Sequence, residues 1–272
     1  MRYLLFTINN QKKVNKIKLI LLKLLKRDNL IIKILSIIKN SYISFKNVKK
    51  FSLKYSIILL PKLIQGKIFY ENNREQILNN KYKSIFKKEC KFSYKDWFSY
   101  NIPVWKNIIN KIKSINYLEI GSFEGRSCLF ISQLKNTNSV TAVDTWKGSH
   151  EHTKILFKKV FENFKININY KNRSKIIFFK QTSDKFFIRN KNIYNLIYID
   201  GSHEYSQVKK DFKNSFNCLE KNGYIICDDF MWFFYKDLDK NPMKAILECY
   251  NEYKKKLNVE FVNHQIIFKK IV

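Results

Sequence analysis

The sequence lacks the patterns that mark several protein classes. Its five cysteines are odd in number and show no Cys-x-x-Cys spacing, which argues against a disulfide framework or a zinc site and predicts reduced thiols. No charge-free apolar run approaches the length of a membrane span. The first ten residues also lack the basic start, long apolar stretch and cleavage site of a signal peptide. Together these absences predict a cytoplasmic location.

Acidic residues are scarce as well. There are 22 Asp and Glu against 52 Lys and Arg, which gives a net charge of +30. Basic surfaces attract polyanions such as nucleic acids. However, Lys, Ile and Asn are abundant throughout the chain, and this bias fits an AT-rich genome as well as it fits a ligand. A solvated basic surface is therefore the favoured explanation, and a nucleic-acid partner is not expected.

The basic excess is strongest in residues 1–70, where sixteen Lys and Arg accompany one acid. Apolar residues from Val14 to Leu25 recur at helical spacing, while Lys23 and Lys26 fall on the opposite side. A basic amphipathic helix can lie on an anionic membrane surface, such as the inner surface of a cell membrane. It can equally pack against its own domain or a partner subunit. We expect a basic, mainly helical extension, and both interpretations stay open.

The most informative segment is a short apolar strand that ends in Glu-x-Gly-x-x-x-Gly, from Glu119 to Gly125. Glycine tolerates the positive φ of such a turn and leaves room for a nucleotide against the backbone. Twenty-three residues after Gly121, the next apolar run ends in Asp144. An acidic residue at that place holds ribose hydroxyls in Rossmann-like folds. These features predict a nucleotide-type cofactor site.

The type of cofactor follows from what the turn lacks. It is not the Gly-x-Gly-x-x-Gly of dinucleotide sites, and the carboxylate of Glu119 would repel a pyrophosphate. The same carboxylate suits a ligand that carries an amino group and a sulfonium. At this point the chain resembles the class I S-adenosylmethionine (SAM)-dependent methyltransferases.

Three further blocks extend the resemblance over roughly residue 91 to the C-terminus. The fourth predicted strand ends in Ile-Asp-Gly-Ser-His-Glu-Tyr, from Ile199 to Tyr205, and the fifth ends in Asp-Asp-Phe-Met-Trp, from Asp228 to Trp232. A lead-in block lies upstream, at residues 96–105. Together the blocks are similar to a bacterial methyltransferase family with I-D-G-S-H-x-Y and D-D-[FY]-x-W motifs, akin to macrocin- and catechol-type O-methyltransferases.

Strands and helices alternate after residue 113, which predicts a parallel sheet with right-handed crossovers. We expect an α/β fold: a Rossmann-like three-layer sandwich with a mostly parallel seven-stranded sheet, a C-terminal antiparallel hairpin and a helical N-terminal extension. The expected parts are the extension (1–70), with an apolar run ended by Pro61, a helical lid or lead-in segment (71–113) and the methyltransferase domain (114–272). The expected strands are 117–120, 139–143, 175–180, 196–199, 224–227 and the hairpin 259–262 with 265–268, joined by Asn263-His264. The expected helices are 126–134, 153–164, 183–189, 205–219 and 242–255.

The resemblance also implies which residues bind SAM. Asp144 would take the ribose hydroxyls, with Thr145 and Trp146 close by, although ordinary packing explains Trp146 almost as well. Ser183 or Asp184 would stand near the adenine. The methionine and ribose part would be lined by Glu119, Gly121, Ser122 and Gly125, and Asp200 would also touch the cofactor.

Catalysis of methyl transfer to a hydroxyl needs positioning and a base. His203 lies three residues beyond Asp200 on the turn after the fourth strand, and histidine titrates near neutral pH. It is the candidate base, with capping or packing as its alternative, and Asp200 is the second candidate catalytic residue. Asp200, Asp228 and Asp229 end adjacent strands, so their carboxylates would crowd one volume and could hold Mg²⁺. Alternatively, Asp228 and Asp229 merely cap a turn.

Three functions stay open from the sequence. The leading one is a SAM-dependent methyltransferase that acts on a hydroxyl oxygen of a small molecule or sugar, with Mg²⁺ as a candidate second cofactor. The second is a methyltransferase of nucleic acid or protein, although no Asn-Pro-Pro-Tyr-type motif for methylation of base amino groups is present. The third is a non-catalytic membrane-surface protein with a methyltransferase-like fold. The sequence does not predict the acceptor.

Overall fold

The computed structural model describes residues 30–78, 85–86, 89–148, 155–169, 176–233 and 235–272. The predicted amphipathic segment from Val14 to Leu25 lies outside these residues. So does the predicted start of the helix at residue 153. Among the described helices, none is long and apolar enough to cross a membrane.

The core of the molecule is one seven-stranded sheet with the order β3-β2-β1-β4-β5-β7-β6. The first five strands pair in parallel, and β7 and β6 continue the sheet as an antiparallel hairpin. This arrangement confirms the predicted sheet and its closing hairpin. The strands are β1 (Ile115–Ile120), β2 (Thr137–Asp144), β3 (Ile176–Lys180), β4 (Tyr194–Ile199), β5 (Leu219–Cys227), β6 (Leu257–Val262) and β7 (Ile266–Lys270).

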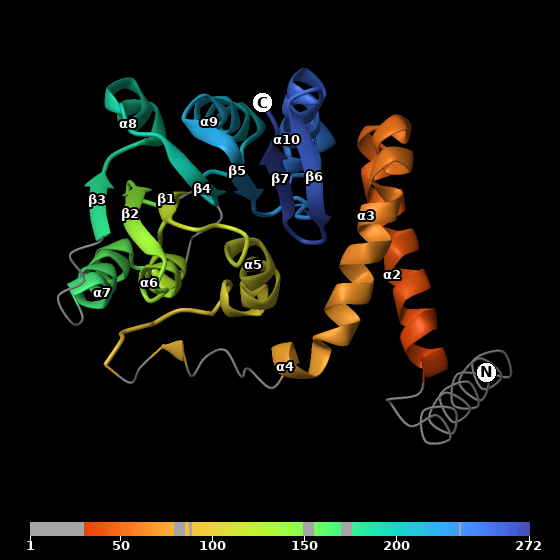
Figure 1. Ribbon diagram of the computed structural model, residues 1–272, viewed down its shortest axis with the longest axis horizontal. Coiled ribbons are helices and arrows are strands. Elements are labelled where there is room, and N and C mark those ends of the chain that lie inside the picture. Colours follow the sequence, from red (N-terminus) through yellow and green to blue (C-terminus); the bar gives the residue numbers. More distant parts are fainter. Residues whose placement is uncertain (1–29, 79–84, 87–88, 149–154, 170–175, 234) are drawn as a thin grey trace, which may run out of the picture.

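Helices cover both faces of the sheet and complete the three layers (Figure 1). One face carries α5 (Ile102–Ile109), α6 (Arg126–Ser132) and α7 (Phe157–Asn169); the other carries α8 (Ser183–Arg189), α9 (Tyr205–Asn217) and α10 (Pro242–Tyr253). Two hydrophobic clusters fill the spaces between the layers, and alternate strand residues point into each. Leu118, for example, belongs to one cluster and Tyr117 to the other. Because both faces are covered, the central strands are continuous apolar runs.

The described part of the N-terminal extension forms a pair of helices, α2 (Leu30–Phe51) and α3 (Leu53–Asn72), beside strand β6 (Figure 1). Ser52 begins α3 by accepting a hydrogen bond from the backbone of Tyr55 at 3.3 Å. Pro61, which ends the apolar run in the sequence, does not end the helix, because α3 continues through it. Packing on β6 holds the helix together, with Leu59 and Leu63 buried in the core. The proposed boundary at residue 70 therefore falls inside a helix.

The lead-in segment is less helical than predicted. Its described helices are α4 (Arg74–Leu78), the short 3-10 helix η2 (Ser99–Asn101) and α5, and residues 90–98 form none. In this stretch the backbone forms hydrogen bonds with side chains of other elements instead. Ser93 donates its N–H to Glu124 (2.7 Å), and Lys91 donates its N–H to Asn167 (2.7 Å). These contacts fix an irregular strap over the loop after β1.

Two further element boundaries differ from prediction. Helix α7 runs from Phe157 to Asn169, later than the expected 153–164. Helix α9 ends at Asn217 and β5 begins at Leu219, because that strand extends five residues further toward the N-terminus than expected. The first residue of that extension, Leu219, pairs with Tyr194 of β4, so tertiary pairing decides this boundary.

Candidate functional site

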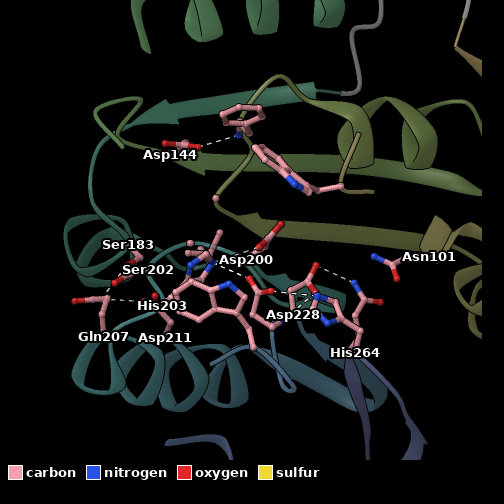
Figure 2. Close-up of a pocket in the computed structure, with 18 of the residues that line it drawn as sticks. Asn101, Asp144, Ser183, Asp200, Ser202, His203, Gln207, Asp211, Asp228 and His264 are labelled. Atoms are coloured by element: carbon pink, nitrogen blue, oxygen red, sulfur yellow. Dashed lines mark hydrogen bonds and ion pairs between the residues drawn. The ribbon is translucent and has the colours of Figure 1, made fainter. Parts of the chain in front are cut away.

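A cavity of about 1440 Å³ opens at the carboxyl ends of the parallel strands, where open α/β sheets bind ligands. It is lined by residues that follow β1, β2, β3, β4 and β5, together with residues of the lead-in segment and of the hairpin. Figure 2 shows its polar side chains from these separate elements converging on one volume. The predicted site residues that line it are Gly121, Asp144, Thr145, Ser183, Asp184, Asp200, His203, Asp228 and Asp229.

The turn after β1 is held in place by Asp144. Gly121 has φ +89°, and a Cβ there would lie 1.9 Å from the backbone oxygen of Asp200, so no other residue fits. One carboxylate oxygen of Asp144 accepts the N–H groups of Ser122 and Phe123, both at 2.9 Å. The other accepts the N–H of Trp146 at 2.7 Å. Asp144 thus ties the end of β2 to the glycine turn.

Burial raises the pKa of Asp144, and its backbone hydrogen bonds oppose that rise. The N–H of Thr145 acts on the same carboxylate and also opposes the rise. Asp144 is thus a structural acceptor for the backbone around the turn as well as a residue of the cavity wall. The ring of Trp146 packs on Phe161 and Phe164 and its Nε1 donates to Phe123, which is a packing role.

Three of the predicted cofactor residues do not line the cavity. Glu119 is fully buried below the turn, where the hydroxyl of Tyr117 donates to it. Burial raises the pKa of Glu119 to about 7. Ser122 is buried too, and Gly125 sits at the start of α6 with φ +80°, packed against Phe164. These residues shape the turn from beneath.

A second polar cluster lies where α8 meets α9. The Nε2 of Gln207 lies 3.1 Å from Ser183 Oγ and 3.0 Å from both Asp184 Oδ1 and Asp211 Oδ1. Burial raises the pKa of Asp211 to about 6. Gln207 and Asp211 line the cavity but were not predicted, because nothing in the local pattern of α9 separates them from ordinary polar helix residues.

The third cluster contains the predicted aspartates. The hydroxyl of Tyr198 contacts both Asp200, at 2.9 Å, and Asp228. The Nε2 of His203 lies 2.8 Å from Asp229 and 4.0 Å from Asp200. The three carboxylates therefore meet at one place in the cavity, as Figure 2 also shows for Asp200 and Asp228.

His264 was missed by the sequence analysis, which treated it as a turn residue of the hairpin. Its Nε2 lies 3.2 Å from Asp229 and 3.7 Å from Asp228. The start of β7 pairs with the end of β5, and this places the turn beside Asp228. Gln265, next along the chain, donates to Asp228 at 3.0 Å and accepts from the indole of Trp105 at 2.9 Å. Only knowledge of the strand pairing could have predicted these contacts.

The charges within this cluster are unevenly distributed. Burial and then the neighbouring charge of Asp228 raise the pKa of Asp200, although the Asp200 side chain is 33% exposed and solvent moderates the effect. Burial and then the charge of Asp229 likewise raise the pKa of Asp228. Burial would raise the pKa of Asp229 as well, but the hydrogen bonds from His203 and His264 outweigh it and lower that pKa. Burial lowers the pKa of His264, but its hydrogen bond to Asp229 and the charges of Asp228, Asp229 and Asp200 together raise it more.

The donor set fits a divalent cation. The ligand atoms of Asp200, His203 and Asp229 lie within 4.8 Å of one another, as do those of Asp228, Asp229 and His264. Carboxylates suit Mg²⁺, and imidazoles add donors that Mn²⁺ and similar ions accept. In the part of the chain that the structure describes, no lysine or arginine forms an ion pair with these three aspartates. A cation would therefore offset both the burial and the mutual repulsion that raise the pKa values of Asp200 and Asp228.

Comparison with known proteins agrees with this architecture. Residues 118–230 match a family model described as a methyltransferase domain. A protein of Acanthamoeba polyphaga mimivirus, itself uncharacterized, is 28% identical over 139 residues, which are 49% of this chain and 60% of the relative. The chain thus matches less than two thirds of that relative's length.

Solved structures of proteins named as methyltransferases align with this chain. A putative caffeoyl-CoA O-methyltransferase from Staphylococcus aureus aligns with a TM-score of 0.50 and 17% identity, covering 77% of this chain and 100% of that one. A putative methyltransferase from Streptococcus mutans, solved in complex with SAH, aligns with a TM-score of 0.48 and 12% identity, covering 66% and 100%. The fold is the Rossmann-like fold of methyltransferases, and residues 118–230 match a methyltransferase domain.

Proposed function

We propose that this protein is a SAM-dependent methyltransferase that methylates a hydroxyl oxygen of a small molecule or sugar. The observation that carries the proposal is that one cavity contains both the glycine turn tied to Asp144 and the cluster of aspartates and histidines. Drug-sized ligands fill pockets of roughly 300–1,000 Å³. A cavity of about 1440 Å³ therefore has room for SAM and a small acceptor together.

The donor end of the cavity would be the glycine turn. Gly121 and Asp144 both line the cavity, and the Asp144 carboxylate would accept a ribose hydroxyl there beside the N–H groups that it already holds. The cluster around Gln207, Ser183 and Asp184 supplies amide, hydroxyl and carboxylate groups suited to the edge of an adenine. Glu119 would act only indirectly, by supporting the turn.

The acceptor end would be the cluster of aspartates and histidines. SAM supplies an already activated methyl group, and a divalent cation would supply positive charge close to the acceptor oxygen. The chain itself must orient the acceptor and take its proton. Asp229 holds the imidazole of His203 by a hydrogen bond of 2.8 Å, and Trp232 packs on the same ring at 4.7 Å between centroids. His203 is thus held in one orientation at the cavity wall, as a general base requires.

Calorimetric titration of SAM and of SAH tests the proposal. We expect micromolar binding by the wild type and binding at least about tenfold weaker in Asp144→Ala, because both the turn and the ribose contact are lost (about 1.4 kcal/mol per tenfold change). Asp239→Ala, an exposed aspartate outside the cavity, is the matched control. His203→Asn should bind SAM like the wild type. Thermal melting shows that each variant is folded, and absence of SAM binding by the folded wild type would reject the proposed function.

A further inference from the structure

Exposed apolar side chains gather on the N-terminal helix pair. Of the twenty-one large hydrophobic side chains that are exposed among the described residues, twelve lie on α2 and α3. On α2 they recur at helical spacing, as do those on α3. We name these stripes the α2–α3 face and define it by Ile34, Leu35, Ile38, Tyr42, Leu53, Ile57, Ile64 and Ile68.

Among the described residues, this face is not the one that packs on the rest of the molecule. Helix α2 buries Ser41, Ser44 and Val48, and α3 buries Leu59 and Leu63. Those residues point toward α3, β6 and α10, which the two helices contact. The residues of the α2–α3 face are each more than a third exposed, so each helix has a second apolar side that the described chain leaves in solvent.

The charges around this face have one sign. Residues 30–70 contain eight lysines and no acid. Lys39, Lys46, Lys49, Lys50 and Lys54 are exposed alongside the apolar stripes. Interleaved Ile, Leu and Lys residues suit a boundary where an apolar phase meets negative charge.

The charge pattern indicates which kind of partner fits the α2–α3 face. A second copy of the chain would bring eight more lysines and no acid against the first eight, which is repulsive. A nucleic acid offers phosphates to the lysines but leaves exposed isoleucines against a polar backbone. An anionic phospholipid surface offers both headgroup charge for the lysines and acyl chains for the isoleucines.

We infer that the α2–α3 face binds the surface of an anionic phospholipid bilayer, with the helices lying in the interface. The lysines then contact headgroups while Ile38, Ile57 and their neighbours insert between the acyl chains. This inference is independent of the proposed methyltransferase activity.

Vesicle flotation with the full chain tests the inference. The probes are vesicles of phosphatidylcholine alone and vesicles with about 30 mol% phosphatidylglycerol, whose charge attracts each lysine by about 1 kcal/mol, or roughly fivefold in affinity. We expect binding to the anionic vesicles only, and weaker binding when NaCl is raised from about 0.1 to about 0.5 M. Failure of the folded wild type to bind anionic vesicles, or equal binding to both kinds, would overturn the inference.

Two variants assign the binding to this face. Ile38→Ser with Ile57→Ser removes apolar contacts, and Lys39→Gln with Lys46→Gln removes charge. Each pair should weaken binding to anionic vesicles at least about tenfold. Ile188→Ser, on α8, is the matched control because Ile188 is 82% exposed and should not matter. Circular dichroism and thermal melting show that the variants are folded.

The remaining outcomes contradict the inference. Wild-type binding that neither pair weakens would place membrane contact elsewhere in the chain. A dimer in light scattering that the isoleucine pair dissociates, without vesicle binding, would make the face a protein interface. Retention of RNA that the lysine pair abolishes, again without vesicle binding, would make it a nucleic-acid surface.

Discussion

At the scale of single residues, carboxyl groups of similar chemistry have different environments. Glu119 is sealed below the glycine turn, Asp144 is occupied by three backbone N–H groups, and Asp229 is paired with two imidazoles. Burial favours the protonated form of the first, whereas the imidazoles favour the ionised form of the last. Below about pH 7 the cluster can thus present negative charge while Glu119, beneath the turn, keeps its proton.

The buried Glu119 should make stability depend on pH. Its pKa is raised from 4.5 to about 7 in the folded chain, so between these values the folded state keeps a proton that the unfolded state has lost. The free energy of unfolding must then decrease as pH rises through this window, by on the order of 3 kcal/mol at most. Urea unfolding of wild type and Glu119→Gln across the window measures the difference. Parallel curves for the two proteins would show that Glu119 ionises normally.

The aspartate cluster should bind divalent cations. Calorimetry with Mn²⁺ or Mg²⁺ is expected to show binding that Asp228→Asn weakens at least about tenfold, whereas Asp237→Asn, outside the cavity, leaves it unchanged. Affinity should increase with pH, because the raised pKa of Asp200 keeps it protonated at higher pH than an ordinary aspartate and protons compete with the cation. If Asp228→Asn binds the cation as tightly as the wild type does, Asp228 is not part of the cation site.

At the scale of elements, α3 is seated on the hairpin through a glycine. A Cβ at Gly66 would lie 1.9 Å from the backbone oxygen of Val262, at the end of β6. This close approach also brings Lys67 into a hydrogen bond with Asn263, the neighbour of His264. The helix and the turn that carries a cluster histidine are therefore in direct contact.

Replacing Gly66 by alanine tests this contact, because the contact determines whether the substitution raises or lowers the free energy of unfolding. Helix propensity alone would stabilise the chain by about 1 kcal/mol, because alanine is the better helix former. The clash with Val262 should instead destabilise it by roughly 1–3 kcal/mol. Gln65→Ala, at an exposed position on the same helix, is the control. Chemical unfolding of the wild type, Gly66→Ala and Gln65→Ala shows whether the Gly66 substitution stabilises or destabilises the fold. A stabilised Gly66→Ala would show that α3 does not contact β6 this closely.

The elements also show what the sequence could predict. The positions of the parallel strands, and the polar motif that follows each of them, could be predicted from the sequence. Buried strands are apolar runs, and each run here ends in a distinctive polar block. The inward position of Glu119 was not predicted from its motif, although it alternates with Leu118 and shares the face of Tyr117. The path of α3 through Pro61 and the approach of His264 to Asp229 depend on long-range packing that no local pattern encodes. The roles of the site residues stay predictions.

At the scale of the whole molecule, the extension and the sheet share one core. Val48, Tyr55, Leu59 and Leu63 belong to the same buried cluster as strands β4 and β5. Tyr55 also donates a hydrogen bond to Asn251 of α10 at 2.6 Å. Cooperative unfolding of extension and sheet follows from this shared core.

The four tryptophans of the chain make this cooperativity measurable, because they all lie outside α2 and α3. Leu63→Ala removes a fully buried side chain from α3 and should lower the free energy of unfolding by about 2–5 kcal/mol. Tryptophan fluorescence and far-ultraviolet circular dichroism should shift together. Ile64→Ala, on the exposed side of the same turn, should cost much less. A shift in the circular dichroism alone would mean that the extension unfolds by itself.

The contact between α3 and the sheet has a further consequence for the evolution of selectivity. Phe69 and Tyr70 at the end of α3, and Ile77 of α4, line the same cavity as the glycine turn. Part of the cavity wall thus comes from helices that precede the sheet, and the glycine turn comes from a later part of the chain. Exchange of residues 53–78 between related chains would therefore reshape this wall while the glycine turn stays unchanged.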